Sequence, residues 1–293
     1  MIIPRHYEDL GVLHENTMPA RAYYIPASKR IDTLVEKRED SDRIQMLNGK
    51  WRFCYFKSIY ELEDAFYEIG YDVTSYDWIE VPGVWQMVGY DSHQYTNIRY
   101  PFPFDPPYVP QNNPCGAYIH QFKYEKDCYA PKVYLNFEGV DACFYVWLNG
   151  TYIGYSQVSH ATSEFDVSDT IIEGNNTLAV LVLKWCDGSY LEDQDKFRMS
   201  GIFRDVYLLK RPKQAVRDYF VQTELNETKA IVSVQVQYFE EMIPTSITLL
   251  DAADERKAFC ETGKEFLLEI SEPILWNPEE PYLYTLVIET ENE

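Results

Sequence analysis

The chain has 293 residues, and 46% of them are hydrophobic, so it can bury the cores of two domains. Its formal net charge of −21 excludes nucleic acid and an anionic membrane surface as natural partners, because both would repel an acidic protein. No apolar stretch approaches the length of a membrane-spanning helix. These properties fit a soluble protein that acts on a neutral substrate.

The six cysteines give no sign of a metal site or a redox pair. None forms a CxxC pair, and none lies at metal-ligand spacing from a histidine. We therefore expect buried, reduced thiols in a cytosolic protein. The first ten residues, MIIPRHYEDL, lack the apolar region of a secretory signal, so the sequence predicts a cytoplasmic location. The cysteines are Cys54, Cys115, Cys128, Cys143, Cys186 and Cys260.

Residues 1–41 are polar and show no sustained hydrophobic period, which predicts an extended N-terminal arm. Its segment RAYYIP, residues 21–26, gathers aromatic side chains and is the expected anchoring point. The arm ends in the mixed charge run EKREDSD.

A first domain is predicted over residues 42–212. It opens with a turn at Asn48 and Gly49 that leads into an alternating strand. Ser58 and Glu61 then have the spacing of a capping box, and apolar residues follow at helical positions, so a short helix is predicted. Residues 78–81 form a further expected strand, which a proline ends.

The next segment, residues 83–116, is long and irregular. Six prolines between positions 101 and 114 exclude a helix and a central strand. Its many aromatic residues argue for a packed, rigid loop, and long ordered loops are often functional. The alternative is a cap over the open end of a sheet. The aromatic residues expected to be buried are Trp85, Tyr90, Tyr95, Tyr100, Phe102, Phe104 and Tyr108.

Closely spaced strands rich in β-branched and aromatic residues follow this loop. Asn149 and Gly150 predict a two-residue hairpin between two of them. With almost no helix, the pattern predicts an all-β fold that begins with a jelly-roll β-sandwich of the sugar-binding type. The predicted strands are residues 117–124, 132–137, 142–148, 151–155, 164–167, 178–184 and 206–209.

Shorter strands begin again after Pro212 and predict an immunoglobulin-like β-sandwich over residues 213–293. This region is shorter than the ~100 residues typical of that fold. We therefore expect the last strand to be absent, which would leave the second domain incomplete at the C-terminus. The predicted strands are residues 219–225, 230–238, 246–250, 266–270 and 282–289.

The stretch WCDGSYLEDQDKFRMSGIFRDV, residues 185–206, combines acidic, basic and aromatic side chains. Carboxylates beside aromatic faces suit a sugar site, because sugars offer hydroxyl groups to bond and apolar ring faces to stack. Taken alone, the pattern favours a second interpretation, a charged loop whose ions pair with one another and whose aromatic residues fill a sheet edge.

Motifs along residues 47–286 resemble the β-galactosidases of glycoside hydrolase family 2, the family of the bacterial lactose-cleaving enzyme. The resemblance is specific because six motifs occur in the right order, and it favours the sugar-site interpretation of residues 185–206. The segment LWNPEEPYLYTL at 275 is similar to the signature of the second domain. The six motifs are LNGKWRF at 47, VPGVWQMVGYD at 81, YTNIRYPF at 95, GVDACFYVWLNGTYIGYSQ at 139, SEFDVS at 163 and DGSYLEDQDKFRMSGIFRDV at 187.

The resemblance implies the front portion of a retaining enzyme that hydrolyses terminal β-D-galactosides such as lactose. In the family, a following barrel carries two catalytic glutamates, which double displacement requires to lie ~5 Å apart, and the magnesium ligands. A barrel takes ~250 residues, which do not fit after residue 212. We therefore expect no catalytic residue in this chain and no hydrolysis by the chain alone. Its expected partner is the barrel of the same full-length protein.

Two site residues are carried over by the motifs. Asn97, in YTN, matches the family asparagine that bonds sugar hydroxyls, and an amide can both donate and accept. Asp195, the second aspartate of DQD, matches the carboxylate that contacts the sugar and ligates a sodium ion, which prefers hard oxygen donors. The structural alternatives are an Asx-turn cap for Asn97 and a surface pair with Arg198 for Asp195.

Other functions remain open from sequence alone. Another family 2 glycosidase, a β-glucuronidase or a β-mannosidase, would share the same two domains. A free-standing carbohydrate-binding module is an alternative of a different class. The resemblance also implies a homo-oligomer for the full-length protein. The second domain is compact between Val236 and Trp276, which puts in doubt a family contact with a neighbouring subunit.

Overall fold

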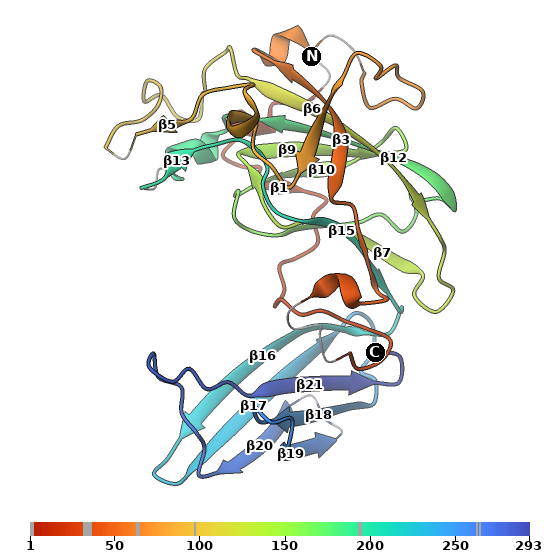
Figure 1. The fold of residues 1–293 in the computed structure, drawn as a ribbon, viewed down its shortest axis with the longest axis vertical. Helices are drawn as coiled ribbons and strands as arrows, with labels where there is room; N and C mark the ends of the chain where they lie inside the picture. Colours follow the sequence, from red (N-terminus) through yellow and green to blue (C-terminus); the bar gives the residue numbers. More distant parts are fainter. Residues whose placement is uncertain are drawn as a thin grey trace. The chain divides into compact units, whose positions relative to one another are not determined.

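The computed structural model describes residues 3–31, 37–62, 65–96, 98–192, 195–261, 263 and 265–293. It is built almost entirely of strands, which confirms the predicted all-β class (Figure 1). The chain divides into two compact units, the first made of Met1–Ala20 and Ile44–Lys210 and the second of Arg21–Arg43 and Arg211–Glu293. Residues 1–41, which the sequence grouped as one arm, are therefore shared between the two units.

The first unit contains a seven-stranded and a four-stranded antiparallel sheet, the architecture of the predicted jelly roll. The larger sheet runs in the order β1 (His14–Glu15), β10 (Thr151–Gln157), β9 (Cys143–Leu148), β12 (Gly174–Leu183), β6 (Cys115–Tyr124), β3 (Gly49–Phe56) and β4 (Asp77–Val81). The smaller sheet runs in the order β11 (Ser163–Asp166), β7 (Lys132–Phe137), β15 (Val206–Arg211) and β2 (Ile44–Met46).

Both faces of the larger sheet are covered. Val146 and Val180, on β9 and β12, belong to one buried cluster, whereas their neighbours Trp147 and Leu181 belong to another. The second cluster also contains Tyr7, so the start of the chain contributes to it. A strand buried on both faces needs no polar alternation, which explains the continuous apolar run at the end of β12.

The helix predicted after Ser58 is wrong in length. Among the described residues from 58 to 70, the structure has a single 3₁₀ turn, η3 (Ile59–Glu61), in which the Ser58 hydroxyl accepts from the Tyr60 amide. The Glu61 carboxylate accepts from the Lys57 amide at 3.0 Å. Ser58 and Glu61 therefore stabilise a local turn. Phe66, beyond the turn, is fully buried and packs edge-on against Trp147, and this tertiary contact outweighs the helical pattern.

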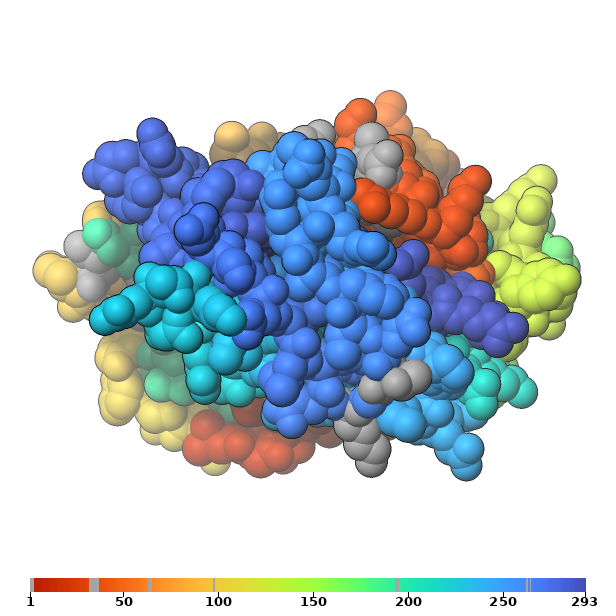
Figure 2. All heavy atoms as spheres, turned by 90° about the horizontal axis from the view of Figure 1, so that it is seen from below, coloured from red at the N-terminus to blue at the C-terminus, as the bar shows by residue number. Residues whose placement is uncertain are grey.

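The second unit consists of two three-stranded sheets, in keeping with the immunoglobulin-like prediction. One contains β16 (Val216–Leu225), β17 (Lys229–Tyr238) and β20 (Glu265–Ser271); the other contains β19 (Arg256–Glu261), β18 (Thr245–Leu250) and β21 (Thr285–Thr290). The sequence did not predict β19, because only Ala258 and Cys260, both small, pack towards its core. The blue segments of this unit form much of the face drawn in Figure 2.

The RAYYIP segment anchors residues 21–43 to the second unit, as the sequence predicted. The Tyr24 hydroxyl donates to the carbonyl of Val216 at 2.6 Å, and its ring meets Tyr219 edge-on at 5.8 Å. Arg211 is fully buried beside Tyr24, and its guanidinium pairs with the Glu293 carboxylate at 2.7 Å. Desolvation works against this charge, but Tyr24 and Glu293 outweigh it and raise the pKa of Arg211.

The cysteines are all free thiols. Cys115, Cys143 and Cys186 are buried as expected, whereas Cys128 is exposed in the turn between β6 and β7. The expectation of burial is therefore wrong for Cys128, because a polar connection offers no core to enter. Within the described ranges, no helix is long and apolar enough to cross a membrane.

Candidate functional site

A two-stranded ribbon brings the proline-rich loop and the charged stretch together. It consists of β5 (Gln94–Tyr95) and β13 (Phe197–Arg198), with Phe197 opposite Tyr95 and Arg198 opposite Gln94. The two strands lie side by side at one end of the first unit (Figure 1). Segments that flank Asn97 and Asp195 are thus held next to each other by backbone hydrogen bonds.

Asp195 lies at the exposed edge of this ribbon, where the Tyr95 hydroxyl donates a hydrogen bond to its Oδ1. This bond to an anionic acceptor is the main reason why the pKa of Tyr95 is raised. The predicted residue Asn97 lies outside the described residues, but its neighbour Thr96 is described and accepts from Arg198 Nε at 3.3 Å. Tyr95 was not among the predicted site residues, although it stands in the same YTN motif.

Exposed aromatic side chains surround the ribbon, which corrects the expectation that the loop's aromatic residues are buried. Trp85 is fully buried, but Tyr95 is 53% exposed and Phe104 is 64% exposed. These exposed rings pack against neighbouring aromatic side chains: the Tyr95 ring lies 5.7 Å from that of Phe197, and the Phe104 ring lies 5.5 Å from that of the buried Tyr190. Exposed aromatic faces beside a carboxylate can stack on the apolar face of a sugar.

Tyr190 fixes the proline-rich loop. Its hydroxyl donates to the carbonyl of Tyr108 at 2.6 Å and accepts from the amide of Asp105 at 3.2 Å. Its ring also meets those of Tyr100 and Phe102 edge-on, at 5.6 and 5.2 Å. This single side chain explains how a segment with six prolines keeps a defined course near the ribbon.

Arg198 stabilises the ribbon from its buried side. It is buried, donates to Thr96 through Nε and to the Ser189 carbonyl through a terminal nitrogen at 3.3 Å, and lies over the Trp185 ring. The alternative interpretation of Asp195 was a surface pair with this arginine. Through these contacts, the buried Arg198 guanidinium holds both Thr96 and the loop after β12 in position.

A second set of polar residues supports the other side of the stretch. Lys184 pairs with Asp91 at 2.5 Å, and Gln86 accepts from the amide of Ser200 at 2.9 Å. Gly201 has φ +128°, and a Cβ atom there would lie 2.8 Å from the carbonyl oxygen of Gly83. The glycine of the RMSGIF segment is therefore required by backbone conformation and by space.

Asp195 is the residue that could contribute to a cation site. Its Oδ1 accepts a hydrogen bond from Tyr95. A carboxylate has two oxygens with about four lone pairs, so further lone pairs remain that can bind a hard cation. Within the described residues, no group of three or more His, Cys, Asp and Glu side chains is arranged to hold a metal ion. Any sodium ion at Asp195 would need further ligands from elsewhere in the protein.

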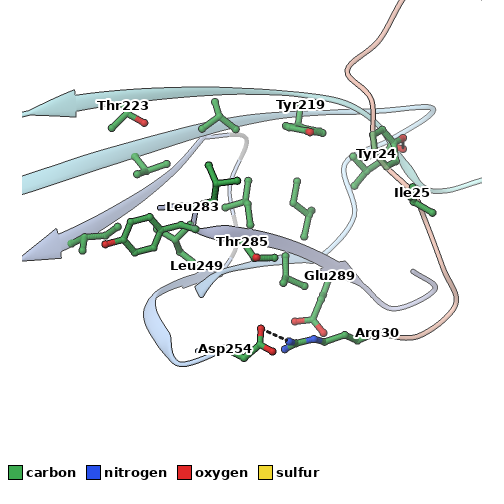
Figure 3. A pocket seen from close by; sticks show the side chains of 18 of the residues that line it. Tyr24, Ile25, Arg30, Tyr219, Thr223, Leu249, Asp254, Leu283, Thr285 and Glu289 are labelled. Carbon is green, nitrogen blue, oxygen red and sulfur yellow. Dashed lines mark hydrogen bonds and ion pairs between the residues drawn. The ribbon is translucent and has the colours of Figure 1, made fainter. Parts of the chain in front are cut away.

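The large cavity of the chain belongs to the second unit and has a different character. Its volume is about 760 Å³, and it opens between the edge strands β16 and β21, with Thr223, Leu283 and Thr285 on its walls (Figure 3). At the opposite side of the sandwich, β19 and β20 lie against each other. Core side chains such as Leu249 line the cavity. It is an open side of the sandwich, with charged residues such as Arg30, Asp254 and Glu289 on one side of it (Figure 3).

Comparison with known proteins defines the family. A family model described as "Glycosyl hydrolases family 2, sugar binding domain" matches residues 44–212, and one described as "Glycosyl hydrolases family 2" matches residues 214–293. The chain belongs to glycosyl hydrolase family 2. This family 2 chain is 46% identical to the β-galactosidase of Actinobacillus pleuropneumoniae and 43% identical to that of Staphylococcus xylosus. Each match covers the whole chain but only 29% of the relative.

Two solved β-glucuronidase structures have a similar fold. A β-glucuronidase from Ruminococcus gnavus matches with a TM-score of 0.65 and 23% identity, over 84% of this chain and 42% of that one. An uncultured Clostridium sp. β-glucuronidase matches with a TM-score of 0.64 and 20% identity, over the same shares. At this level of identity the similarity concerns the fold alone.

Proposed function

We propose that this chain is the non-catalytic front portion of a retaining β-galactosidase that hydrolyses terminal β-D-galactosides such as lactose. The observation that carries the proposal is the 46% identity, over the full length of the chain, to a β-galactosidase. The β-glucuronidase structures are only 20–23% identical. A β-galactoside is therefore preferred over a glucuronide or a mannoside.

Within such an enzyme, the ribbon of β5 and β13 forms one wall of the sugar pocket. Asn97 bonds sugar hydroxyls, and Asp195 contacts the sugar and ligates sodium. The exposed Asp195 carboxylate and the neighbouring rings of Tyr95 and Phe197 support this role, because they combine an anionic oxygen with apolar faces. Magnesium belongs to the barrel of the full-length protein and has no proposed ligand in this chain.

The chemistry requires the rest of the protein. A retaining glycosidase needs an acid/base and a nucleophilic carboxylate ~5 Å apart, and we assign neither role to a residue of this chain. We expect the purified chain to show no turnover of a chromogenic β-galactoside above a vector control. Turnover by the chain would contradict the proposal.

The choice among substrates is tested with the full-length protein. Initial rates on p-nitrophenyl β-galactoside, β-glucuronide and β-mannoside are compared at equal concentrations, and the galactoside is expected to be hydrolysed at least tenfold faster. Preference for either other glycoside would move the assignment to a β-glucuronidase or a β-mannosidase.

A free-standing carbohydrate-binding module is the second candidate, since residues 44–212 match a model described as sugar binding. It predicts that the isolated chain binds lactose by calorimetry. Our proposal predicts no measurable binding, because one wall of a pocket buries too little of the ligand.

We also propose a cytoplasmic location and a homo-oligomeric state for the full-length protein.

A further inference from the structure

The segment that carries Asp195 alternates between exposed and inward-facing residues. Asp195 and Phe197 are exposed, Lys196 keeps 30% side-chain exposure, and Arg198 is buried. The exposed fractions therefore place Lys196 and Arg198, the two cations that follow Asp195 in the sequence, closer to the body of the first unit than Asp195.

Lys196 has two partners, the partly buried Asp141 and His160, which lies at the surface. Its Nζ lies 3.8 Å from Asp141 Oδ2 and 3.5 Å from His160 Nε2. An ammonium group can only donate, so His160 Nε2 accepts and its Nδ1 carries the proton. That Nδ1 lies 2.9 Å from Ser159 Oγ, which in turn donates to Glu192 Oε1 at 3.1 Å. Every member of this chain of hydrogen bonds has a consistent donor and acceptor.

The same histidine must be neutral for this arrangement. The pKa of His160 is lowered, first by burial and then by the cations Lys196 and Arg204. A neutral ring with a proton on Nδ1 satisfies both Lys196 and Ser159. The direction of the pKa shift and the geometry of the hydrogen bonds therefore agree.

Asp141, the partner of Lys196 in the ion pair, and Ser159, which precedes His160, belong to well-anchored parts of the sandwich. Asp141 lies in β8 (Val140–Asp141), which pairs with β14 (Gly201–Ile202). Ser159 is 1% exposed, and its amide also donates to Glu192 at 2.9 Å. Because Lys196 directly follows Asp195 in the chain, an ammonium group fixed at this place restrains the backbone that carries the Asp195 carboxylate.

We propose that Lys196 and Asp141 are positioning residues, which hold the Asp195 carboxylate at the pocket wall by tying its neighbour to the jelly-roll core. The inference rests on the proposed function of Asp195. Lys196 itself faces inwards and does not touch the sugar. Its ion pair acts through the backbone that Lys196 shares with Asp195.

The pair is sensitive to pH near neutrality. Burial raises the pKa of Asp141 to about 7, with Lys196 and Arg198 lowering it and Glu192 raising it. Lys184 lines the same small cavity from the end of β12. Above pH 7 the ionised Asp141 attracts Lys196, and below pH 7 the neutral carboxyl attracts it less. The order of the Asp195 segment is therefore expected to increase from pH 6 to pH 8.

Hydrogen exchange on the 293-residue chain tests this directly. We compare the wild type with Lys196→Gln, Lys196→Arg and Asp141→Asn, after correction for intrinsic exchange at each pH. The removal of a partly buried ion pair is expected to speed exchange of residues 195–200 about threefold or more. Lys196→Arg keeps the charge and is expected to retain wild-type protection. Strand β9 serves as the internal control and is expected to exchange equally in all four proteins.

The pH dependence separates positioning from a merely structural role. Protection of residues 195–200 is expected to rise from pH 6 to pH 8 in the wild type and to stay flat in Asp141→Asn. Equal exchange in Lys196→Gln and the wild type would overturn the inference, as would an unchanged pH dependence in Asp141→Asn.

A kinetic measurement on the full-length protein then links positioning to the pocket. Lys196→Gln is expected to raise the sodium concentration needed for half-maximal activity about threefold or more, with kcat at saturating sodium within twofold of the wild type. An unchanged sodium response would overturn the link to Asp195. If Asp195→Asn leaves the sodium dependence of activity unchanged, the proposed function of Asp195 is wrong. The exchange experiment tests the Lys196–Asp141 ion pair independently of that outcome.

Discussion

The hydroxyl of Tyr95 donates a hydrogen bond to the carboxylate of Asp195, and these two residues are 100 positions apart in the chain. The bond adds a side-chain link to the backbone pairing of β5 with β13. It joins the segment next to Asn97 to the segment of Asp195, so that one small ribbon presents both predicted site segments. Changes at either residue are therefore expected to affect the other.

The titration of Tyr95 reports this bond in the isolated chain. The Asp195 carboxylate stabilises the protonated phenol and raises its pKa above the ordinary value of 10.0. We expect the ultraviolet difference titration of the wild type minus Tyr95→Phe to show one tyrosine that ionises above pH 10. In an Asp195→Asn background the same difference is expected to shift back towards 10. A Tyr95 signal that is identical in both backgrounds would rule out the bond in solution.

Asp195→Asn in the full-length protein tests the proposed sodium role. An amide oxygen binds a cation more weakly than a carboxylate, so sodium affinity is expected to fall. Part of the sugar affinity is expected to fall with it, by about 1–3 kcal/mol for a lost charged contact. If the contact tightens in the transition state, kcat falls as well as KM rising. The measurement is kcat/KM as a function of sodium concentration.

The matched control for that experiment is Asp169→Asn. Asp169 is an exposed aspartate in the turn between β11 and β12 of the same unit, so the substitution removes the same charge from another surface position. It is expected to leave the sodium response unchanged. A wild-type response in Asp195→Asn, or an equal loss in both variants, would reject the specific role of Asp195.

Asp141→Asn is expected to change the dependence of global stability on pH. The pKa of Asp141 is about 7 in the folded chain and near 4 when unfolded, so the folded state holds the proton more tightly. The stabilisation from proton binding is complete below pH 4 and is lost as pH rises to about 7. Asparagine carries no charge that must be buried. The stability of the variant relative to the wild type is therefore expected to rise between pH 5 and pH 8.

The measurement is the Tm of both proteins across that range. A gain of a few degrees at pH 8 relative to pH 5 is expected, which corresponds to about 1 kcal/mol for a chain of this size. A Tm difference that is constant with pH would contradict the raised pKa. Global stability falls as pH rises, because the ionised Asp141 carboxylate is costly to bury. Hydrogen-exchange protection around Lys196 is expected to rise over the same pH range, because the ionised carboxylate attracts the lysine.

The open cavity of the second unit is expected to bind an apolar dye such as anilinonaphthalene sulfonate. Val221, on β16, lines the cavity and is 38% exposed, whereas Ile231, on the adjacent β17, is 36% exposed and does not line it. Val221→Glu is expected to reduce dye fluorescence by half or more, because it places a charge inside an apolar site. Ile231→Glu is the matched control, and an equal reduction in both would place the dye elsewhere.

Hydrogen exchange gives a second view of the same opening. The edge strands β16 and β21 are expected to exchange faster than the central strands β17 and β18, because an edge leaves backbone groups without a sheet neighbour. Uniform protection across the four strands would mean that the opening is covered in solution.

Part of the site was predictable because its signals are local. The motifs around Asn97 and Asp195 marked two segments, and Gly201 stands where the backbone allows little else. Lys196 and His160 were not predicted, since one of eight charged residues in the stretch 185–206 and a lone histidine carry no distinguishing pattern.

The sequence by itself determined the all-β class and most strands, because β-branched and aromatic runs between turn residues such as Asn149 and Gly150 act over short distances. Only the tertiary structure decided which segments meet. The pairing of β5 with β13, the division of residues 1–41 between two units and the 3₁₀ turn after Ser58 all depend on contacts between residues far apart in the chain. The exposure of Tyr95 and Phe104 has the same cause, since aromatic side chains predict burial until the course of the loop is known.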